Sequence, residues 1–85
     1  MTSRTTARFW ECYRQLPVEI RDLARKNYRL WREDAYHPSL RFKPVRKGQW
    51  SVRIGIHYRA TERFSGANEF TWDWIGTHAE YDRLV

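Results

Sequence analysis

The sequence predicts an α+β domain, with two N-terminal helices packed on one face of a small twisted antiparallel sheet of three to four strands. Apolar residues recur three and four positions apart in the first third of the chain, as on an amphipathic helix. Apolar and polar residues then alternate in the second half, as on strands with one buried face. Helices followed by strands favour helices layered on a sheet, and 85 residues correspond to a single domain, 1–85.

The helices are predicted from two apolar stripes. Phe9, Tyr13 and Leu16 form the first stripe, which Pro17 interrupts because proline lacks an N–H group and disfavours helical geometry in the residue before it. The second helix runs to about Glu33, and its stripe consists of Ile20, Leu23, Ala24, Tyr28 and Trp31. Residues 1–7 are polar and form either a frayed tail or a short edge strand.

Strands are predicted for residues 40–44, 50–60 and 70–75. In the first of these, Leu40 and Phe42 face inward, and Pro44 restricts the segment to a short or edge strand. Gly76 and Thr77 end the last strand. A short C-terminal helix or tail follows, with His78, Tyr81 and Leu84.

Residues 50–60 allow either one straight strand or a tight reversal at Gly55. A straight strand would hold Arg53 and Arg59 about 20 Å apart, at ~3.3 Å per residue. A reversal that pairs Ile54 with Tyr58 instead places the two arginines directly opposite each other. Like charges so placed need a negative group between them, which is either the carboxylate of Asp73 or a phosphate of RNA.

The charge of the chain favours polyanionic partners. The formal net charge is +6, and residues 1–47 hold twelve Lys or Arg against five Asp or Glu. Such a balance suits RNA, DNA or an acidic protein segment. The basic face of the second helix is either solvated or a nucleic-acid surface.

Other features narrow the class of protein. Cys12 is alone and excludes an internal disulfide, no apolar run reaches membrane-spanning length, and no signal peptide is evident, so a cytoplasmic protein is expected. One Cys and three scattered His offer no metal-ligand spacing, and no phosphate-binding loop is present. His78 and Tyr81 are the candidates for moving and positioning protons, with a cap or packing role as the alternative for each.

Three stretches resemble the RelE/ParE superfamily of toxins from type II toxin–antitoxin systems, particularly the RelE, YoeB and HigB-like mRNA interferases. Residues 9–31 resemble the paired N-terminal helices. Residues 50–59 resemble a strand–turn–strand with one arginine before the turn and another after it. Residues 75–78 together with Tyr81 resemble the C-terminal strand and the catalytic residues that follow it.

The resemblance implies an endoribonuclease that cleaves ribosome-bound mRNA without metal or other cofactor, by attack of a 2′-OH on the adjacent phosphate. Carried over, Arg53 and Arg59 neutralise the phosphate, His78 transfers the proton, and Tyr81 orients the substrate or assists. The RNA backbone is held by Arg41, Lys43, Arg46 and Lys47. No carboxylate partner is evident for His78.

The resemblance also implies partners and alternatives. A cognate antitoxin protein would place an acidic or amphipathic segment across the basic surface. One alternative is a ParE-like toxin that inhibits DNA gyrase by protein binding. Another is a RelE-fold module that binds RNA or protein with weak or no nuclease activity.

Overall fold

The computed structural model describes residues 2–66 and 68–84 as three α-helices, a short 3-10 helix and five strands. In chain order the elements are β1 Thr2–Thr5, α1 Ala7–Arg14, α2 Val18–Glu33, the 3-10 helix η1 Pro38–Leu40, β2 Lys43–Arg46, β3 Gln49–Ile54, β4 Tyr58–Phe64, β5 Glu69–Thr77 and α3 His78–Leu84.

The strands form one mixed sheet in the order β1-β5-β4-β3-β2. Strands β2 to β5 pair antiparallel in succession, whereas β1 pairs parallel with β5, Thr2 opposite Glu69. The predicted antiparallel sheet is confirmed for the four strands β2 to β5, and of the two alternatives for residues 1–7 the structure shows the short edge strand. The prediction of three to four strands was incomplete, because this fifth strand is parallel to its neighbour. Residues 2–5 have no apolar alternation that predicts a strand. They form one only because the folded chain brings β5, a segment far away in the sequence, next to them.

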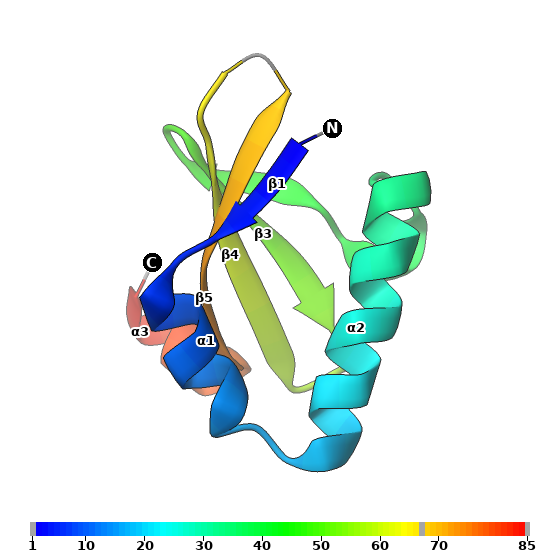
Figure 1. Ribbon diagram of the computed structural model, residues 1–85, viewed down its shortest axis with the longest axis vertical. Helices are drawn as coiled ribbons and strands as arrows, with labels where there is room; N and C mark the ends of the chain where they lie inside the picture. Colours follow the sequence, from blue (N-terminus) through cyan, green and yellow to red (C-terminus); the bar gives the residue numbers. More distant parts are fainter. Residues whose placement is uncertain (1, 67, 85) are drawn as a thin grey trace.

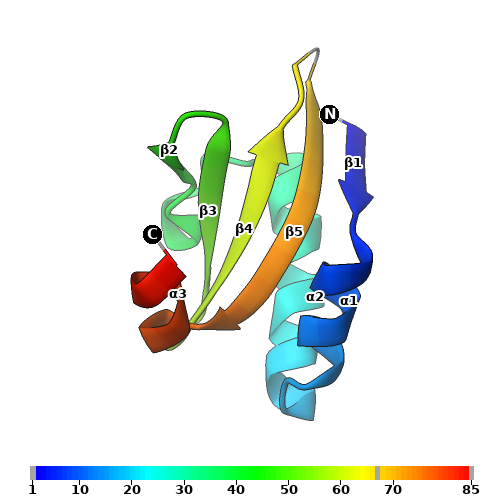
Figure 2. The same ribbon diagram turned by 90° about the vertical axis from the view of Figure 1, so that its left-hand side faces the viewer.

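The sheet separates two unequal helical layers. Helices α1 and α2 cover one face, and α3 lies on the opposite face, as the side view shows (Figure 2). The prediction of two N-terminal helices on one face is confirmed, and the C-terminal segment is a third helix rather than a tail. Among the described residues, no helix is both long enough and apolar enough to cross a membrane.

The core is an aromatic cluster beneath α2. Trp31 is fully buried, and its ring lies 5.1 Å from that of Trp72 and 5.5 Å from that of Phe70. Phe42 packs edge-on against Trp31 at 6.0 Å. Aromatic side chains bury large areas, so this cluster gives a short chain much of its hydrophobic stabilisation.

Local boundaries differ from expectation in two places. Residues 40–44 do not form one strand, because Leu40 ends the 3-10 helix and β2 starts only at Lys43. Strand β5 continues through Gly76 to Thr77 and leads directly into α3. Leu40 is nevertheless buried and Phe42 packs on the core, as the alternation predicted.

Candidate nucleic-acid interface

The chain reverses at Gly55, and the reversal brings the two arginines together. Gly55 has a φ of +65°, a left-handed conformation that glycine adopts without strain. The register pairs Ile54 with Tyr58 and Arg53 with Arg59. Of the two geometries that the sequence allowed, the structure therefore shows the hairpin, in which both arginines lie on the same face of neighbouring strands.

Two nitrogens of the Arg59 guanidinium group have no acceptor in the part of the chain that the structure describes. Its Nε and Nη1 atoms are buried and have no hydrogen-bond partner among the described residues. The guanidinium carbon lies 5.5 Å from the centre of the Tyr81 ring, a cation–π contact. Buried donors normally find acceptors, so these two nitrogens are suited to an anion that the protein itself does not supply.

The carboxylate of Asp73 does not lie between the two arginines. It accepts a hydrogen bond from Thr61 Oγ1 at 2.6 Å and forms an ion pair with Arg63 Nε at 3.3 Å. Arg53 has a different local contact, because its Nε donates to the carbonyl of Gly55 at 2.9 Å. The interpretation in which Asp73 neutralises this arginine pair was wrong.

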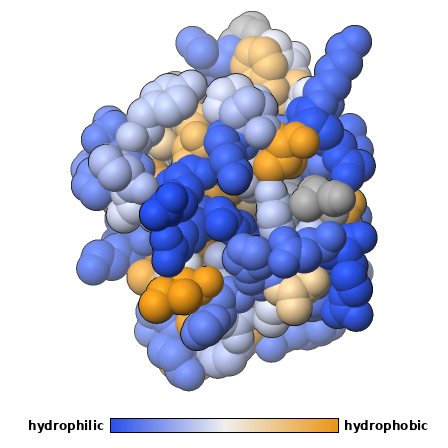
Figure 3. Space-filling model, turned by 180° about the vertical axis from the view of Figure 1, so that it is seen from behind, coloured by the Kyte–Doolittle hydropathy of each residue, from blue (hydrophilic) through white to orange (hydrophobic). Residues whose placement is uncertain are grey.

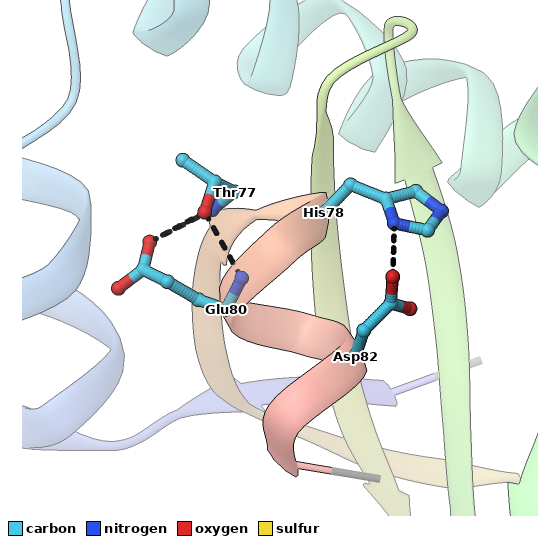
Figure 4. A network of polar contacts seen from close by, with 4 residues as sticks. All are labelled: Thr77, His78, Glu80 and Asp82. Atoms are coloured by element: carbon cyan, nitrogen blue, oxygen red, sulfur yellow. Dashed lines mark hydrogen bonds and ion pairs between the residues drawn. The ribbon is translucent and has the colours of Figure 1, made fainter.

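Helix α3 is fixed at its start by a capping box. The amide of Glu80 donates to Thr77 Oγ1 at 3.1 Å, and the amide of Thr77 donates to Glu80 Oε1 at 3.0 Å (Figure 4). The amide of His78 also donates to the carbonyl of His57, at 2.7 Å, in the β3–β4 turn. His78 is thereby held beside the hairpin that carries the two arginines.

His78 has a carboxylate partner one helical turn away. Its Nδ1 lies 3.1 Å from Asp82 Oδ2, and both side chains are partly exposed (Figure 4). The expectation that His78 lacks such a partner was wrong. The signal was present in the sequence as the spacing of four between His78 and Asp82, which faces side chains on a helix toward each other.

Tyr81 connects the imidazole to the guanidinium. It is 7% exposed, and its ring centre lies 5.9 Å from that of His78 in an edge-on arrangement. The same ring contacts Arg59. The structure thus brings Arg59, His78 and Tyr81 together, and places Arg53 opposite Arg59 across the hairpin.

Further basic side chains lie on the same face of the sheet. Lys43 pairs with Ser51, two residues before Arg53, so it shares the face of the arginines. Arg46 donates through Nη2 to the carbonyl of Leu84 at the end of α3, at 3.0 Å. This side of the molecule is mainly hydrophilic with separate apolar patches (Figure 3). Arg41 and Lys47 are exposed, one in a left-handed conformation after η1 and the other in the β2–β3 turn.

Within residues 2–66 and 68–84, no three His, Cys, Asp or Glu side chains are grouped in a way that could hold a metal ion.

Comparisons with known proteins give a likeness in structure alone. No protein-family model matches the sequence, and a search of curated proteins finds no match. A YoeB/ParE toxin from Agrobacterium tumefaciens superposes with a TM-score of 0.71 at 19% identity, covering 92% of this chain and 99% of that chain. RelE from the RelB–RelE antitoxin–toxin complex of Methanococcus jannaschii gives 0.70 at 13% identity, covering 96% and 99%.

YafQ from Escherichia coli strain BL21(DE3) gives a TM-score of 0.68 at 10% identity, covering 93% of this chain and 94% of that chain. The resemblance to RelE/ParE-type toxins is therefore confirmed at the level of the fold, over nearly the whole chain.

Proposed function

We propose that this protein is the toxin of a type II toxin–antitoxin pair and that it is a ribosome-dependent mRNA endonuclease of the cytoplasm. One observation carries the proposal. Arg59 presents two buried, unpartnered guanidinium nitrogens beside His78, on a fold shared with YoeB/ParE, RelE and YafQ toxins. A guanidinium group is a planar donor that suits phosphate oxygens, so Arg59 is suited to an RNA phosphate.

In this reaction His78 acts as the proton acceptor. Nδ1–H donates to Asp82, which leaves the Nε2 lone pair free to take the proton of the 2′-OH. The bond from the 2′ oxygen to phosphorus forms, the bond from phosphorus to the 5′ oxygen breaks, and water protonates the 5′ oxygen. No metal is required for these steps.

The arginines supply electrostatic stabilisation. Negative charge grows on the phosphate oxygens as the 2′ oxygen attacks, and Arg59 and Arg53 offset it where it develops. Tyr81 keeps the Arg59 guanidinium in position through its ring. The RNA backbone is held by Lys43, Arg46, Arg41 and Lys47.

The test is growth arrest after induction in a bacterial host, combined with mapping of new mRNA 5′ ends. Arg59→Ala should lower the cleavage rate about 10²–10³-fold, since one group that stabilises transition-state charge contributes that much. His78→Ala should remove the proton acceptor, and the new mRNA 5′ ends should then be absent. Arg63→Ala is the matched control, because Arg63 lies on the same strand but already pairs with Asp73.

Because Arg59 packs under Tyr81, Arg59→Lys and circular dichroism distinguish lost chemistry from lost folding. If Arg59→Ala and His78→Ala arrest growth as strongly as the parent, the nuclease assignment is wrong. Arrest accompanied by DNA damage, without new mRNA 5′ ends, identifies the gyrase-directed alternative instead. Tight RNA binding without arrest identifies a binding module.

A further inference from the structure

Strand β3 extends beyond the strand on its outer side. The pairing of β2 with β3 reaches Ser51, opposite Lys43, and goes no further. Residues 52–54, which include Arg53, therefore have β4 on one side and no strand on the other within the part of the chain that the structure describes. A carbonyl group on such an edge needs a partner from elsewhere, or the end of the strand is free to fray.

A side chain of α2 takes the place of the missing strand. Nδ2 of Asn27 donates a hydrogen bond to the carbonyl oxygen of Arg53 at 3.1 Å. Asn27 is half-buried near the middle of α2, and Figure 1 shows this helix running beside β3. Because a regular helix holds its own backbone in place, the amide group of Asn27 fixes the position of the Arg53 backbone.

The same face of α2 also holds the turn that follows Arg53. Leu23 lies four positions before Asn27, so both side chains project from one face of the helix. A Cβ atom at Gly55 would lie 2.9 Å from Leu23 Cδ2, so the leucine packs directly on the backbone of the turn. The Arg53 guanidinium group donates through Nε to the carbonyl of Gly55 at 2.9 Å. Helix α2 therefore contacts both the backbone of Arg53 and the residue that orients its side chain.

These contacts oppose a repulsion inside the hairpin. Arg53 and Arg59 are directly opposite in the register, and like charges at such positions destabilise a strand pair. We propose that Asn27 is a positioning residue of the RNA-cleaving site: it holds the Arg53 backbone, and with it the Arg53 guanidinium group, in place beside Arg59. This inference rests on the proposed function, in which both arginines offset charge on the phosphate. Asn27 acts from the α2 side of the sheet, whereas the RNA lies on the α3 side.

The loss of Asn27 should affect the cleavage step. A displaced guanidinium group offsets less of the charge that develops on the phosphate. Asn27→Leu has nearly the same size as the parent residue but no donor. Its kcat for ribosome-bound mRNA should fall about tenfold, with KM changed by less than about twofold. Ala24→Gly is the matched control, because it weakens the same helix without removing a hydrogen bond, and its kcat should stay within about twofold of the parent value.

A double variant separates positioning from a general loss of stability. If Asn27 acts through Arg53, then Asn27→Leu should slow the parent but should not slow Arg53→Ala any further. Thermal unfolding checks that the variants fold, and Asn27→Ala replaces Asn27→Leu if the latter is unfolded. The inference is overturned if folded Asn27→Leu cleaves as fast as the parent, or if it slows Arg53→Ala by the same factor as it slows the parent. An Arg53→Ala variant with the parent's rate also overturns it.

The Nε–H group of Arg53 gives a readout that does not depend on cleavage. Its hydrogen bond to Gly55 slows exchange of this proton with water. Measured by NMR, the exchange should become several-fold faster in Asn27→Leu and stay unchanged in Ala24→Gly. An unchanged rate in Asn27→Leu overturns the inference alone, since the parent still cleaves mRNA. A parent that cleaves no mRNA overturns the proposed function and this inference with it.

Discussion

At the scale of single residues, the most unusual group is a carboxyl in the interior of the sheet. Glu62 is fully buried, pairs with Trp50 on β3 and with Trp72 on β5, and has no hydrogen-bond partner among the described residues. Burial raises the pKa of its carboxyl from 4.5 to about 9, and the nearby negative charge of Asp73 adds to the shift. Glu62 is therefore protonated and neutral in the folded protein at neutral pH.

This state makes stability depend on pH. Below pH 4.5 the Glu62 carboxyl is protonated in both the folded and the unfolded protein, so its ionisation takes nothing from the free energy of unfolding. Between pH 4.5 and about 9 folding takes up a proton. The free energy of unfolding should then fall by about 1.4 kcal/mol per pH unit from this group.

Glu62→Gln removes the titration and should flatten this dependence, so that the variant is more stable than the parent near pH 8. Urea unfolding at several pH values measures the effect. Glu33→Gln, at the exposed end of α2, is the control that keeps the parent's slope. An unchanged slope in Glu62→Gln would show that another group is responsible.

Asp82 is a positioning residue for His78 in the proposed reaction. Asp82→Asn keeps the shape of the side chain but removes its charge and weakens its preference for Nδ1–H. The rate of RNA cleavage should fall at least about tenfold, because the ring of His78 is no longer held with Nε2 toward the 2′-OH. Asp22→Asn on α2 is the control. An unchanged cleavage rate in Asp82→Asn would show that this carboxylate does not position His78.

At the scale of elements, α3 decides whether the site is assembled. It is only one and a half to two turns long, so it depends on its cap and on packing of Tyr81. The backbone and side-chain hydrogen bonds from Thr77 lower the pKa of Glu80. The contribution of the Glu80 carboxylate to the free energy of unfolding is therefore present above pH 4.5. It is lost as the pH falls through the lowered pKa.

Thr77→Ala should cost about 1 kcal/mol and loosen the first turn of α3, whereas Thr77→Ser keeps the hydroxyl and should behave as the parent does. Hydrogen exchange of the α3 amides measures the loosening, and urea unfolding measures the cost. Cleavage should fall with Thr77→Ala because His78 and Tyr81 lose their fixed positions. Unchanged exchange at α3 would show that packing alone holds this helix.

Strand β5 has a related constraint at Gly76, which pairs with Arg59. A Cβ atom at this position would lie 2.5 Å from the ring of Trp74 and 3.1 Å from Glu80 Oε1. Such contacts are too close, so a side chain at Gly76 would displace either the tryptophan or the helix cap. Because Gly76 has no side chain, the start of α3 can pack close to β5 next to Arg59.

At the scale of the whole molecule, the sequence predicted what depends on local pattern. Periodicity located both N-terminal helices, and Gly55 permitted the hairpin that sets Arg53 against Arg59. The parallel strand β1 was left undecided because Thr2–Thr5 has no apolar alternation, and a pairing 67 positions apart leaves no local trace. The pairing of two strands that are far apart in the sequence depends on the topology of the fold and not on the residues next to each strand.

In the candidate site, too, features that depend on local sequence pattern could be predicted and features that depend on long-range pairing could not. The pairing of arginines followed from the register of one hairpin. The role of Asp73 could not be read from sequence, because a register shift opposite Thr61 and Glu62 leaves Asp73 as an extra, unpaired residue of β5. The carboxylate of Asp73 therefore contacts Thr61 and Arg63. The His78–Asp82 pair was readable from its spacing.

The positive charge of the proposed RNA-binding surface leads to a last prediction. If RNA binds as proposed, about six cationic side chains neutralise its phosphates, namely Arg41, Lys43, Arg46, Lys47, Arg53 and Arg59. For a single strand, the logarithm of the binding constant should then fall with the logarithm of salt concentration at a slope of about −4.

Lys43→Ala should make that slope shallower by about 0.7, because one fewer counterion is released. Lys26→Ala is the matched control: it removes the same charge from an exposed position on α2, on the other side of the sheet, and should leave the slope at its parent value. Fluorescence titration of a labelled single-stranded RNA at several salt concentrations measures both. If Lys26→Ala changes the slope and Lys43→Ala does not, the RNA lies along the basic face of α2, and Arg59 is not its phosphate contact.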